Sequence, residues 1–414
     1  MVAAICRYGV RVAPDTDRII RECRKSGHLV EGPQIAEFEQ AFARRLGGGY
    51  ASSASLGRMA FYYILKALDL PRDSEIVIPA LTFWVVPEMA RLAGLRLVFA
   101  DIDPNTFLLD PECLQRAITP RTRAVVPTHL YGVTCDMDAI GKIARKHDLR
   151  VIEDCAHALG ATYRGRPAGT FGDAAFFSFQ SGKPLNAFGG GMSFTRDAAL
   201  GARIAAFSAA EPPPSEDRVL KKLRVGRLQR FFSSPAAFTL TGFPVLWVAS
   251  QFHSLPDIYM WERVRPLRPQ EEGYCERFSN VQAALGLAGL DHLDEWNARC
   301  RRNAEIFTKA LAGIEGVKPP STPPQCVSVN YQYCVYVPDR DKVVEKCIQR
   351  GVDVETKHVD VCTEAALFGP QTPAPGASGA AKVVQLPVYA SLSEEQATAI
   401  ARRVRGVLLR MTGK

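Results

Sequence analysis

The residues best suited to chemistry in this 414-residue chain lie together, between Val151 and Gly191. A strand-like run ends in Glu153-Asp154, a second run ends in Ser178-Phe179, and Lys183 follows in a loop of small residues before a triple glycine. A lysine can form an imine, a carboxylate can keep a ring nitrogen protonated, and hydroxyl groups can bind phosphate. This set suits pyridoxal phosphate chemistry, while the loop by itself is equally typical of a solvated lysine.

The elements that must position these residues are strands that alternate with helices. Six short runs are almost continuously apolar, as in strands buried on both faces of a mainly parallel sheet. They cover residues 76–78, 95–99, 124–127, 151–152, 174–179 and 191–195. Helical patterns separate several of them, at 87–93, 110–117 and 137–147. The alternation predicts an α/β fold, in which ligands bind at the carboxyl ends of the strands.

The pattern changes after residue 269 and predicts a second unit. A long helix is expected from Asn280 to about Leu311, then a strand-like run at 327–337, a helix at 342–350 and a last helix from Ser393. We therefore expect a large domain over residues 1–290, with an atypical insertion at 211–272, and a smaller C-terminal α+β domain over 291–414. The Pro/Gly/Ser-rich stretch Gly369 to Ala380 predicts a surface loop.

Composition excludes several classes of protein. The 51 Lys and Arg residues exceed the 43 Asp and Glu by only eight, which is far from the excess of a nucleic-acid-binding protein and supports at most a weak preference for anionic ligands. The eleven cysteines form no CxxC pair and indicate neither a disulfide framework nor a metal site. With no secretory signal pattern at the start, we expect a cytoplasmic protein.

The segment 151–191 resembles the DegT/DnrJ/StrS family of sugar aminotransferases, which are fold-type-I pyridoxal phosphate enzymes. It matches, almost position by position, the family pattern EDxAxALGAxYxGxxxGxxGDxxxFSFxxxKxLxxxxGG. The similarity extends to residues 26–47, 52–55, 78–83 and 281–286, and to LPVYASLSEEQ near the end. The resemblance implies a large domain with a mainly parallel sheet between helices, and a smaller C-terminal domain.

The resemblance also implies catalytic roles. Lys183 occupies the place of the Schiff-base lysine that shuttles the proton, where some relatives that dehydrate sugars have histidine. Asp154 corresponds to the aspartate that pairs with the pyridinium nitrogen. His157 corresponds to a Gln or His beside the ring hydroxyl; as a lone histidine it is also typical of core packing.

Further positions correspond to the family's cofactor cradle. Ser55 and Leu56 correspond to residues at the start of a helix whose N–H groups face the phosphate. Ser178 corresponds to a serine that contacts the phosphate, and Phe83 to the aromatic residue that stacks on the pyridine ring. In the absence of the resemblance, both Ser178 and Phe83 would be interpreted as core residues.

One departure concerns a contact that the family makes across a dimer interface. An asparagine of the neighbouring subunit commonly binds the phosphate, whereas this chain has Cys275 at that place, and a thiol is a poor donor. Arg277 is retained. We expect a homodimer with the active site at the interface. Tyr333 and His358 lie where the family's small domain approaches the substrate and are candidates for contact with it, while a structural role is the more common one for each.

The function implied is an aminotransferase that moves an amino group from an amino acid, by family habit L-glutamate, to a keto group of a nucleotide-activated sugar. Such chemistry belongs to polysaccharide or antibiotic sugar biosynthesis. The alternatives are the same chemistry on a cyclitol, lipid-linked or other hydrophobic ketone, and a catalytically silent regulatory or binding relative. Intact Lys183, Asp154 and Ser178 argue against the silent relative.

The insertion raises a separate question. Six basic residues and no acid lie between Arg218 and Arg230, and they lead into an uncharged segment from Phe231 to Pro256. Prolines and a glycine interrupt that segment, which argues against a transmembrane helix. One interpretation is a peripheral contact of residues 218–256 with the inner face of a membrane. The other is that the apolar part packs on the protein or covers the active site while the basic part attracts a phosphate-bearing substrate.

Overall fold

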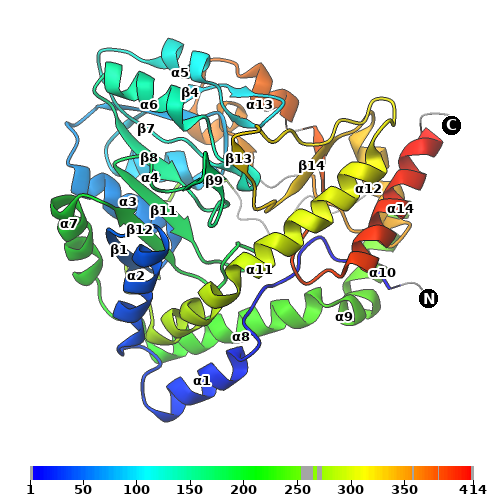
Figure 1. Ribbon diagram of the computed structural model, residues 1–414, viewed down its shortest axis with the longest axis horizontal. Coiled ribbons are helices and arrows are strands. Elements are labelled where there is room, and N and C mark those ends of the chain that lie inside the picture. The colour runs from blue at the N-terminus through cyan, green and yellow to red at the C-terminus, as the bar shows by residue number, and fades with distance from the viewer. Residues whose placement is uncertain (1–2, 253–263, 268–272, 357–358, 381, 412–414) are drawn as a thin grey trace.

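A seven-stranded sheet forms the centre of the large domain (Figure 1). The computed structural model describes residues 3–252, 264–267, 273–356, 359–380 and 382–411. The strand order is β1-β12-β11-β8-β7-β2-β4, and β12 runs in the direction opposite to that of the other six strands. The bounds are β1 Tyr50–Ala54, β2 Glu75–Pro79, β4 Arg96–Ala100, β7 Thr122–Val125, β8 Arg150–Asp154, β11 Ala174–Ser178 and β12 Gly191–Thr195. The predicted mainly parallel sheet is confirmed.

Apolar side chains on both faces of the strands explain the continuous apolar runs in the sequence. In β2, Val77 belongs to one core cluster, whereas Ile76 and Ile78 belong to another on the opposite face. Helices complete both cores. They are α1 Thr16–Lys25, α2 Gln34–Arg45, α3 Gly57–Leu68, α4 Val85–Leu92, α5 Pro111–Ala117, α6 Met137–Lys146 and α7 Ala198–Ala209.

A further core belongs to the C-terminal part of the chain. The long helix α11 (Asn280–Leu311) crosses from the large domain to this core (Figure 1). There it packs with β14 Tyr333–Tyr336, β16 Val383–Leu386, α12 Arg340–Ile348 and α14 Glu394–Met411. Ala4, Ile5 and Cys6 are buried in the same core. The first residues therefore pack with the smaller unit, although the sequence places them in the large domain.

The remaining strands and the 3-10 helices are short. They are β3 Leu81–Thr82, β5 Ile102–Asp103, β6 Leu108–Leu109, β9 Thr162–Tyr163, β10 Arg166–Pro167, β13 Cys326–Val327, β15 Asp360–Val361, and the 3-10 helices Leu130–Gly132, Cys362–Glu364 and Ala366–Phe368.

The prediction of a surface loop at 369–380 is wrong for its second half. Residues Pro375–Ala380 form helix α13, in which Ala377 is fully buried. The Asp101 carboxylate accepts the N–H groups of Gly376 and Ala377 at 2.8 and 2.9 Å. A Cβ on Gly376 would lie 2.3 Å from the Ile102 carbonyl oxygen. The small residues therefore serve close packing, which composition alone does not distinguish from a loop.

The described part of the insertion is helical and lies along the body of the protein. It contains α8 Glu216–Ser233, α9 Pro235–Leu240 and α10 Gly242–Gln251. Val219 and Leu223 of α8 join the large-domain core, whereas Phe238 and Leu246 join the C-terminal core. Figure 1 shows α8 running beneath α11. Among the described helices, none has the length and apolar character needed to cross a membrane.

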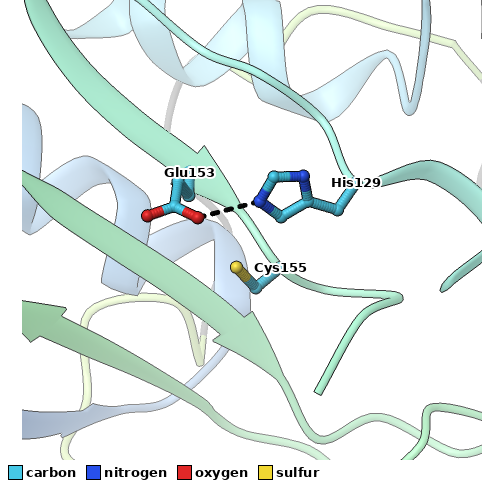
Figure 2. A group of neighbouring side chains, drawn as sticks. All are labelled: His129, Glu153 and Cys155. Atoms are coloured by element: carbon cyan, nitrogen blue, oxygen red, sulfur yellow. Dashed lines mark hydrogen bonds and ion pairs between the residues drawn. The ribbon is translucent and has the colours of Figure 1, made fainter. Parts of the chain in front are cut away.

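A buried hydrogen-bond network fixes the end of β8 (Figure 2). The Glu153 carboxylate accepts the N–H groups of Gly169, Phe171 and Gly172 at 2.6–2.8 Å, and the Nε2–H of His129 donates to it at 2.9 Å. Nδ1 of His129 accepts the Cys135 N–H at 3.1 Å, so the ring is neutral. The backbone N–H of His129 donates to the Asp154 carbonyl at 3.0 Å. Two loops are thereby held against the strand end that carries Asp154.

We expect Glu153→Gln to lower the free energy of unfolding by about 3 kcal/mol, because the new amide NH2 would face backbone N–H donors in a buried site. Urea unfolding followed by circular dichroism measures the change. Glu37→Gln is the matched control, since Glu37 is exposed and its substitution should stay within about 0.5 kcal/mol. Equal unfolding midpoints for the two variants would contradict the role assigned to Glu153.

Candidate active site

A cavity of about 160 Å³ lies at the carboxyl ends of the sheet strands. Six residues singled out from the sequence line it, namely Leu56, Phe83, Asp154, His157, Ser178 and Lys183. They come from the ends of β8 and β11, from segments that follow β1, β3 and β8, and from the loop after β11. The parallel arrangement therefore brings residues far apart in the sequence into one space.

Lys183 is carried by the loop that joins β11 to β12. The Phe179 N–H donates to the Gly190 carbonyl at 3.0 Å and closes the loop, and Gly182, at φ +90°, turns the chain just before the lysine. The Lys183 ammonium lies 5.1 Å from the centre of the Tyr331 ring. Burial lowers the pKa of Lys183 to about 8, although the charge of Asp154 acts in the opposite direction. A substantial fraction of the amine is thus neutral and nucleophilic at mildly alkaline pH.

Asp154 ends β8 and is 5% exposed. Burial raises the pKa of its carboxyl group to about 6, while the Ala156 N–H, the Lys183 charge and the Thr128 hydroxyl oppose that rise. The Ala156 N–H donates to its carboxylate at 3.0 Å. The carboxylate is therefore ionised above about pH 6 and can accept a hydrogen bond from a protonated ring nitrogen.

His157 is held by stacking, and its partner is a residue that the sequence analysis missed. The rings of His157 and Tyr331 stack with centres 4.3 Å apart and planes inclined by 26°. Tyr331 lines the cavity and contacts both His157 and Lys183. The tyrosine-rich run at 331–336 is the available signal in the sequence, but it does not distinguish Tyr331 from Tyr333.

Tyr333, one of two candidate substrate contacts, does not line the cavity and has the structural role that was its alternative interpretation. Its ring is 1% exposed and packs on Phe307 in the C-terminal core, and its hydroxyl is 2.7 Å from that of Thr308. Tyr331 lies in a bend just before β14, whereas Tyr333 is the first residue of that strand, so the two rings pack in different cores. The other predicted substrate contact, His358, lies outside the described residues.

The start of α3 forms a cradle beside Ser178. Leu56, Gly57 and Arg58 line the cavity at the first turn of α3, where helix N–H groups have no intrahelical acceptor. A Cβ on Gly57 would lie 2.9 Å from the Ser178 Cβ. This position therefore requires glycine, and the close approach leaves N–H groups and a hydroxyl facing the same space. Such a site suits a phosphate.

The Ser55 hydroxyl has a partner within the protein, while the predicted contact of the backbone N–H groups here with a phosphate stays a prediction. Ser55 is buried, and its hydroxyl donates to the Tyr274 carbonyl. It does not line the cavity, because β1 ends at Ala54 and the next side chain turns into the protein before the helix begins. Leu56, one residue on, is at the cavity wall.

Phe83, which was selected from the sequence, and Arg58, Thr128 and Tyr8, which were not, complete the wall. Phe83 lies at the cavity with the Arg58 guanidinium 5.8 Å from its ring centre. Thr128 follows β7, and Tyr8 reaches the cavity because the N-terminal segment packs with the C-terminal core. Tyr8 donates to Glu355. Position after a strand was an available signal for Thr128, whereas nothing in the local sequence marks Tyr8.

Arg277 and Cys275 lie outside this cavity. Arg277 forms an ion pair with Glu31 at 2.6 Å, and its N–H donates to the Pro212 carbonyl at 2.8 Å. Cys275 is exposed. Within this single chain neither residue reaches the cradle, so their contact with a neighbouring subunit stays a prediction.

A second hollow adjoins the cavity and brings the insertion to the site. It has a volume of about 370 Å³ and shares Leu56, Gln180 and Ser181 with the first cavity. Its opposite wall is α8, which contributes the basic residues Arg218, Lys221 and Lys222. Arg218 and Lys222 also pair with the buried Glu276 at 2.6 and 2.7 Å. We call this hollow the basic cleft.

His129, Glu153 and Cys155 form a buried group of side chains of types that can bind a metal ion (Figure 2). Its candidate ligand atoms lie within 4.8 Å of one another. Both ring nitrogens of His129 and both oxygens of Glu153 are engaged in hydrogen bonds, and burial raises the pKa of the Cys155 thiol to about 12. A metal would need that thiol deprotonated, so the donor set fits a structural network.

Comparison with known proteins agrees with this site. A model of the DegT/DnrJ/EryC1/StrS aminotransferase family matches residues 12–244 and 251–405. A GDP-perosamine synthase of Caulobacter vibrioides is 34% identical over 283 residues, which cover 68% of this chain and 63% of that protein. A dTDP-3-amino-3,4,6-trideoxy-alpha-D-glucose transaminase of Streptomyces venezuelae is 30% identical over 397 residues, covering 94% and 91%.

The fold is also similar to that of a solved aminotransferase. The structure of DesV from S. venezuelae, in complex with a ketimine intermediate, is 29% identical and gives a TM-score of 0.76. The match covers 95% of this chain and 94% of DesV. The family match spans both cores and every strand that contributes to the cavity. The chain therefore belongs to the DegT/DnrJ/EryC1/StrS family and is an aminotransferase.

Proposed function

We propose that the protein is a pyridoxal-phosphate-dependent aminotransferase that transfers an amino group, with L-glutamate as donor, to a keto group of a nucleotide-activated sugar. The observation that carries the proposal is the presence of Lys183 and Asp154 in one buried cavity, where each charge affects the pKa of the other. Intact Lys183, Asp154 and Ser178 also argue against a silent regulatory relative.

The donor set in the cavity fits pyridoxal phosphate. Lys183 would hold its aldehyde carbon, Asp154 its ring nitrogen, and Phe83 would lie against the ring. Ser178 and the N–H groups at the start of α3 would hold the phosphate. When bound, this cofactor supplies an electron sink for a carbanion at the amino-bearing carbon.

The chain's own residues manage protons around that centre. Lys183 can release and accept a proton at Nζ near neutral pH because burial lowers its pKa to about 8. Asp154, ionised above about pH 6, would favour the protonated form of the ring nitrogen. The Glu153–His129 network holds the end of β8, so the Asp154 carboxylate keeps its orientation. The stacked His157 and Tyr331 rings exclude water from one wall.

The basic cleft supports a substrate that carries phosphate groups. Lys221 and Lys222 stand beside the mouth of the cavity, at a place where a diphosphate could bind while a sugar ring enters the site. The names of both curated relatives contain a nucleoside diphosphate, GDP in one and dTDP in the other. We further propose a homodimer, in which Arg277 and Cys275 approach the cradle of the neighbouring subunit.

We expect Lys183→Ala to abolish covalent attachment of pyridoxal phosphate, because Lys183 is the lysine at the cavity. Borohydride reduction followed by mass spectrometry of the intact protein measures the added mass. Lys146→Ala is the control, since Lys146 is exposed on α6 and should retain full attachment. Attachment to the Lys183→Ala protein at more than about 1% of the wild-type level would overturn the assignment of this lysine.

The rate of that attachment should depend on pH with a midpoint near 8, where Lys183 titrates. Below this value the neutral amine becomes scarcer, so the rate should fall about tenfold per pH unit; above it the rate should level off. Borohydride trapping at successive times between pH 6 and 9.5 gives the profile. A rate that still rose tenfold between pH 8.5 and 9.5 would show a lysine with an ordinary pKa.

Lys221→Gln should raise the KM for a nucleotide-activated keto sugar by about tenfold and leave the KM for glutamate unchanged, because a charge-assisted phosphate contact is lost. Steady-state kinetics with each substrate varied in turn measures both constants. Arg230→Gln is the matched control on the same helix, since Arg230 is exposed and does not line the basic cleft. Equal effects of the two substitutions would remove α8 from substrate binding.

A further inference from the structure

The exposed apolar side chains of the protein are concentrated on the insertion. Thirteen large apolar residues are exposed in the described part of the chain, and nine of them lie between Val225 and Phe252. They are Val225, Leu228, Phe231, Phe232, Leu240, Val245, Trp247, Val248 and Phe252. We call these nine residues the apolar patch. Scattered apolar residues are ordinary on a protein surface, but such a concentration on one segment indicates an interaction site.

Helix α10 has apolar side chains on its inner and outer faces. Leu246 is buried in the C-terminal core, whereas Val245, Val248 and Phe252 form an outward stripe at i, i+3 and i+7. Val245 is 67% exposed and Phe252 is 74% exposed. A helix that is apolar all round is normally buried in a core or in lipid. The outer face of α10 therefore needs a partner.

The second half of α8 repeats this arrangement. Gly226 packs inward against Phe188, and Leu223 lies in the large-domain core. Val225, Leu228 and Phe232 are exposed at i, i+3 and i+7, and the rings of Phe231 and Phe232 lie 5.3 Å apart. The two stripes belong to helices joined through the short α9, on which Leu240 is 77% exposed.

Charge selects among the possible partners. The sequence from Arg218 to Phe252 contains no Asp or Glu, and Arg224 and Arg230 are exposed among the apolar residues of α8. Arg227 pairs with the exposed Asp17. If two copies of this face met about a two-fold axis, arginines of like charge would approach each other. An anionic lipid bilayer instead offers an acyl region that can bury the apolar side chains and negatively charged headgroups that attract the arginines.

We propose that the second half of α8, with α9 and α10, binds the interface of an anionic phospholipid bilayer. The ten residues of α10 extend about 15 Å, half the thickness of a bilayer's hydrocarbon core. The segment therefore lies in the membrane interface and does not cross it. Trp247 suits this depth, since its ring is amphipathic. Val225 and Gln229 also line the basic cleft, so the bilayer would lie beside the entrance to the active site.

Flotation of the full-length, pyridoxal-phosphate-loaded protein with vesicles tests the proposal. The wild-type protein should float with vesicles of 30% phosphatidylglycerol in phosphatidylcholine at low salt, and at least tenfold less with phosphatidylcholine alone. The combined variant Leu240→Ser, Val245→Ser, Phe252→Ser should bind the anionic vesicles at least tenfold more weakly. These three side chains are the most exposed of the apolar patch. Circular dichroism checks that the variant is folded.

Matched substitutions at exposed apolar residues elsewhere, Tyr50→Ser and Phe207→Ser, should leave flotation unchanged. Wild-type protein that stays at the bottom with anionic vesicles would overturn the proposal, as would equal flotation of the wild-type and triple-variant proteins. Sedimentation velocity in the absence of lipid provides the remaining comparison. A triple variant that dissociates into a smaller species, together with no flotation of the wild-type protein, would assign the apolar patch to contact between copies of the chain.

Discussion

Desolvation of two opposite charges at one edge of a parallel sheet is the interaction on which the site depends. Burial raises the pKa of Asp154 and lowers that of Lys183, and each charge partly offsets the cost of burying the other. This balance keeps the pKa of Asp154 at about 6 and that of Lys183 at about 8, both close to neutral pH. It also requires that the surrounding strands hold the two groups in place, since a small movement toward water would return both to ordinary values. The Glu153–His129 network and the closed loop at 179–190 provide this rigidity.

Much of this arrangement was predictable because it follows from local patterns. Continuous apolar runs mark strands with two buried faces, and the residues that follow β8 and β11 are chemically distinctive, so Asp154, Ser178 and Lys183 could be selected from the sequence. The same principle, that residues at the carboxyl ends of parallel strands meet, was sufficient to place them together.

The features that were missed depend on tertiary packing. Tyr331 packs in the large-domain core and Tyr333 in the C-terminal core. Tyr8 reaches the cavity because the preceding residues 4–6 pack against the C-terminal core, whose other residues are distant in the sequence. Ser55 turns inward to the Tyr274 carbonyl, a partner more than two hundred residues distant. The 369–380 segment looked like a loop because glycine and alanine allow both exposure and close packing. The roles of α8 were ambiguous for a similar reason, since one side of the helix lines the basic cleft while the apolar residues Leu228, Phe231 and Phe232 of its second half are exposed.

The neighbouring acids at the end of β8 have opposite tasks because a strand sends successive side chains to opposite faces. Glu153 binds backbone N–H groups and His129 on one side, and Asp154 faces the cavity on the other. The alternation makes this dipeptide sensitive to register. A deletion of one residue within β8 would leave the composition of the strand nearly unchanged. It would nevertheless turn Glu153 toward the cavity and Asp154 toward the backbone N–H groups and His129. Length variation in this family should therefore be tolerated in the loops that flank β8 and excluded from the strand itself.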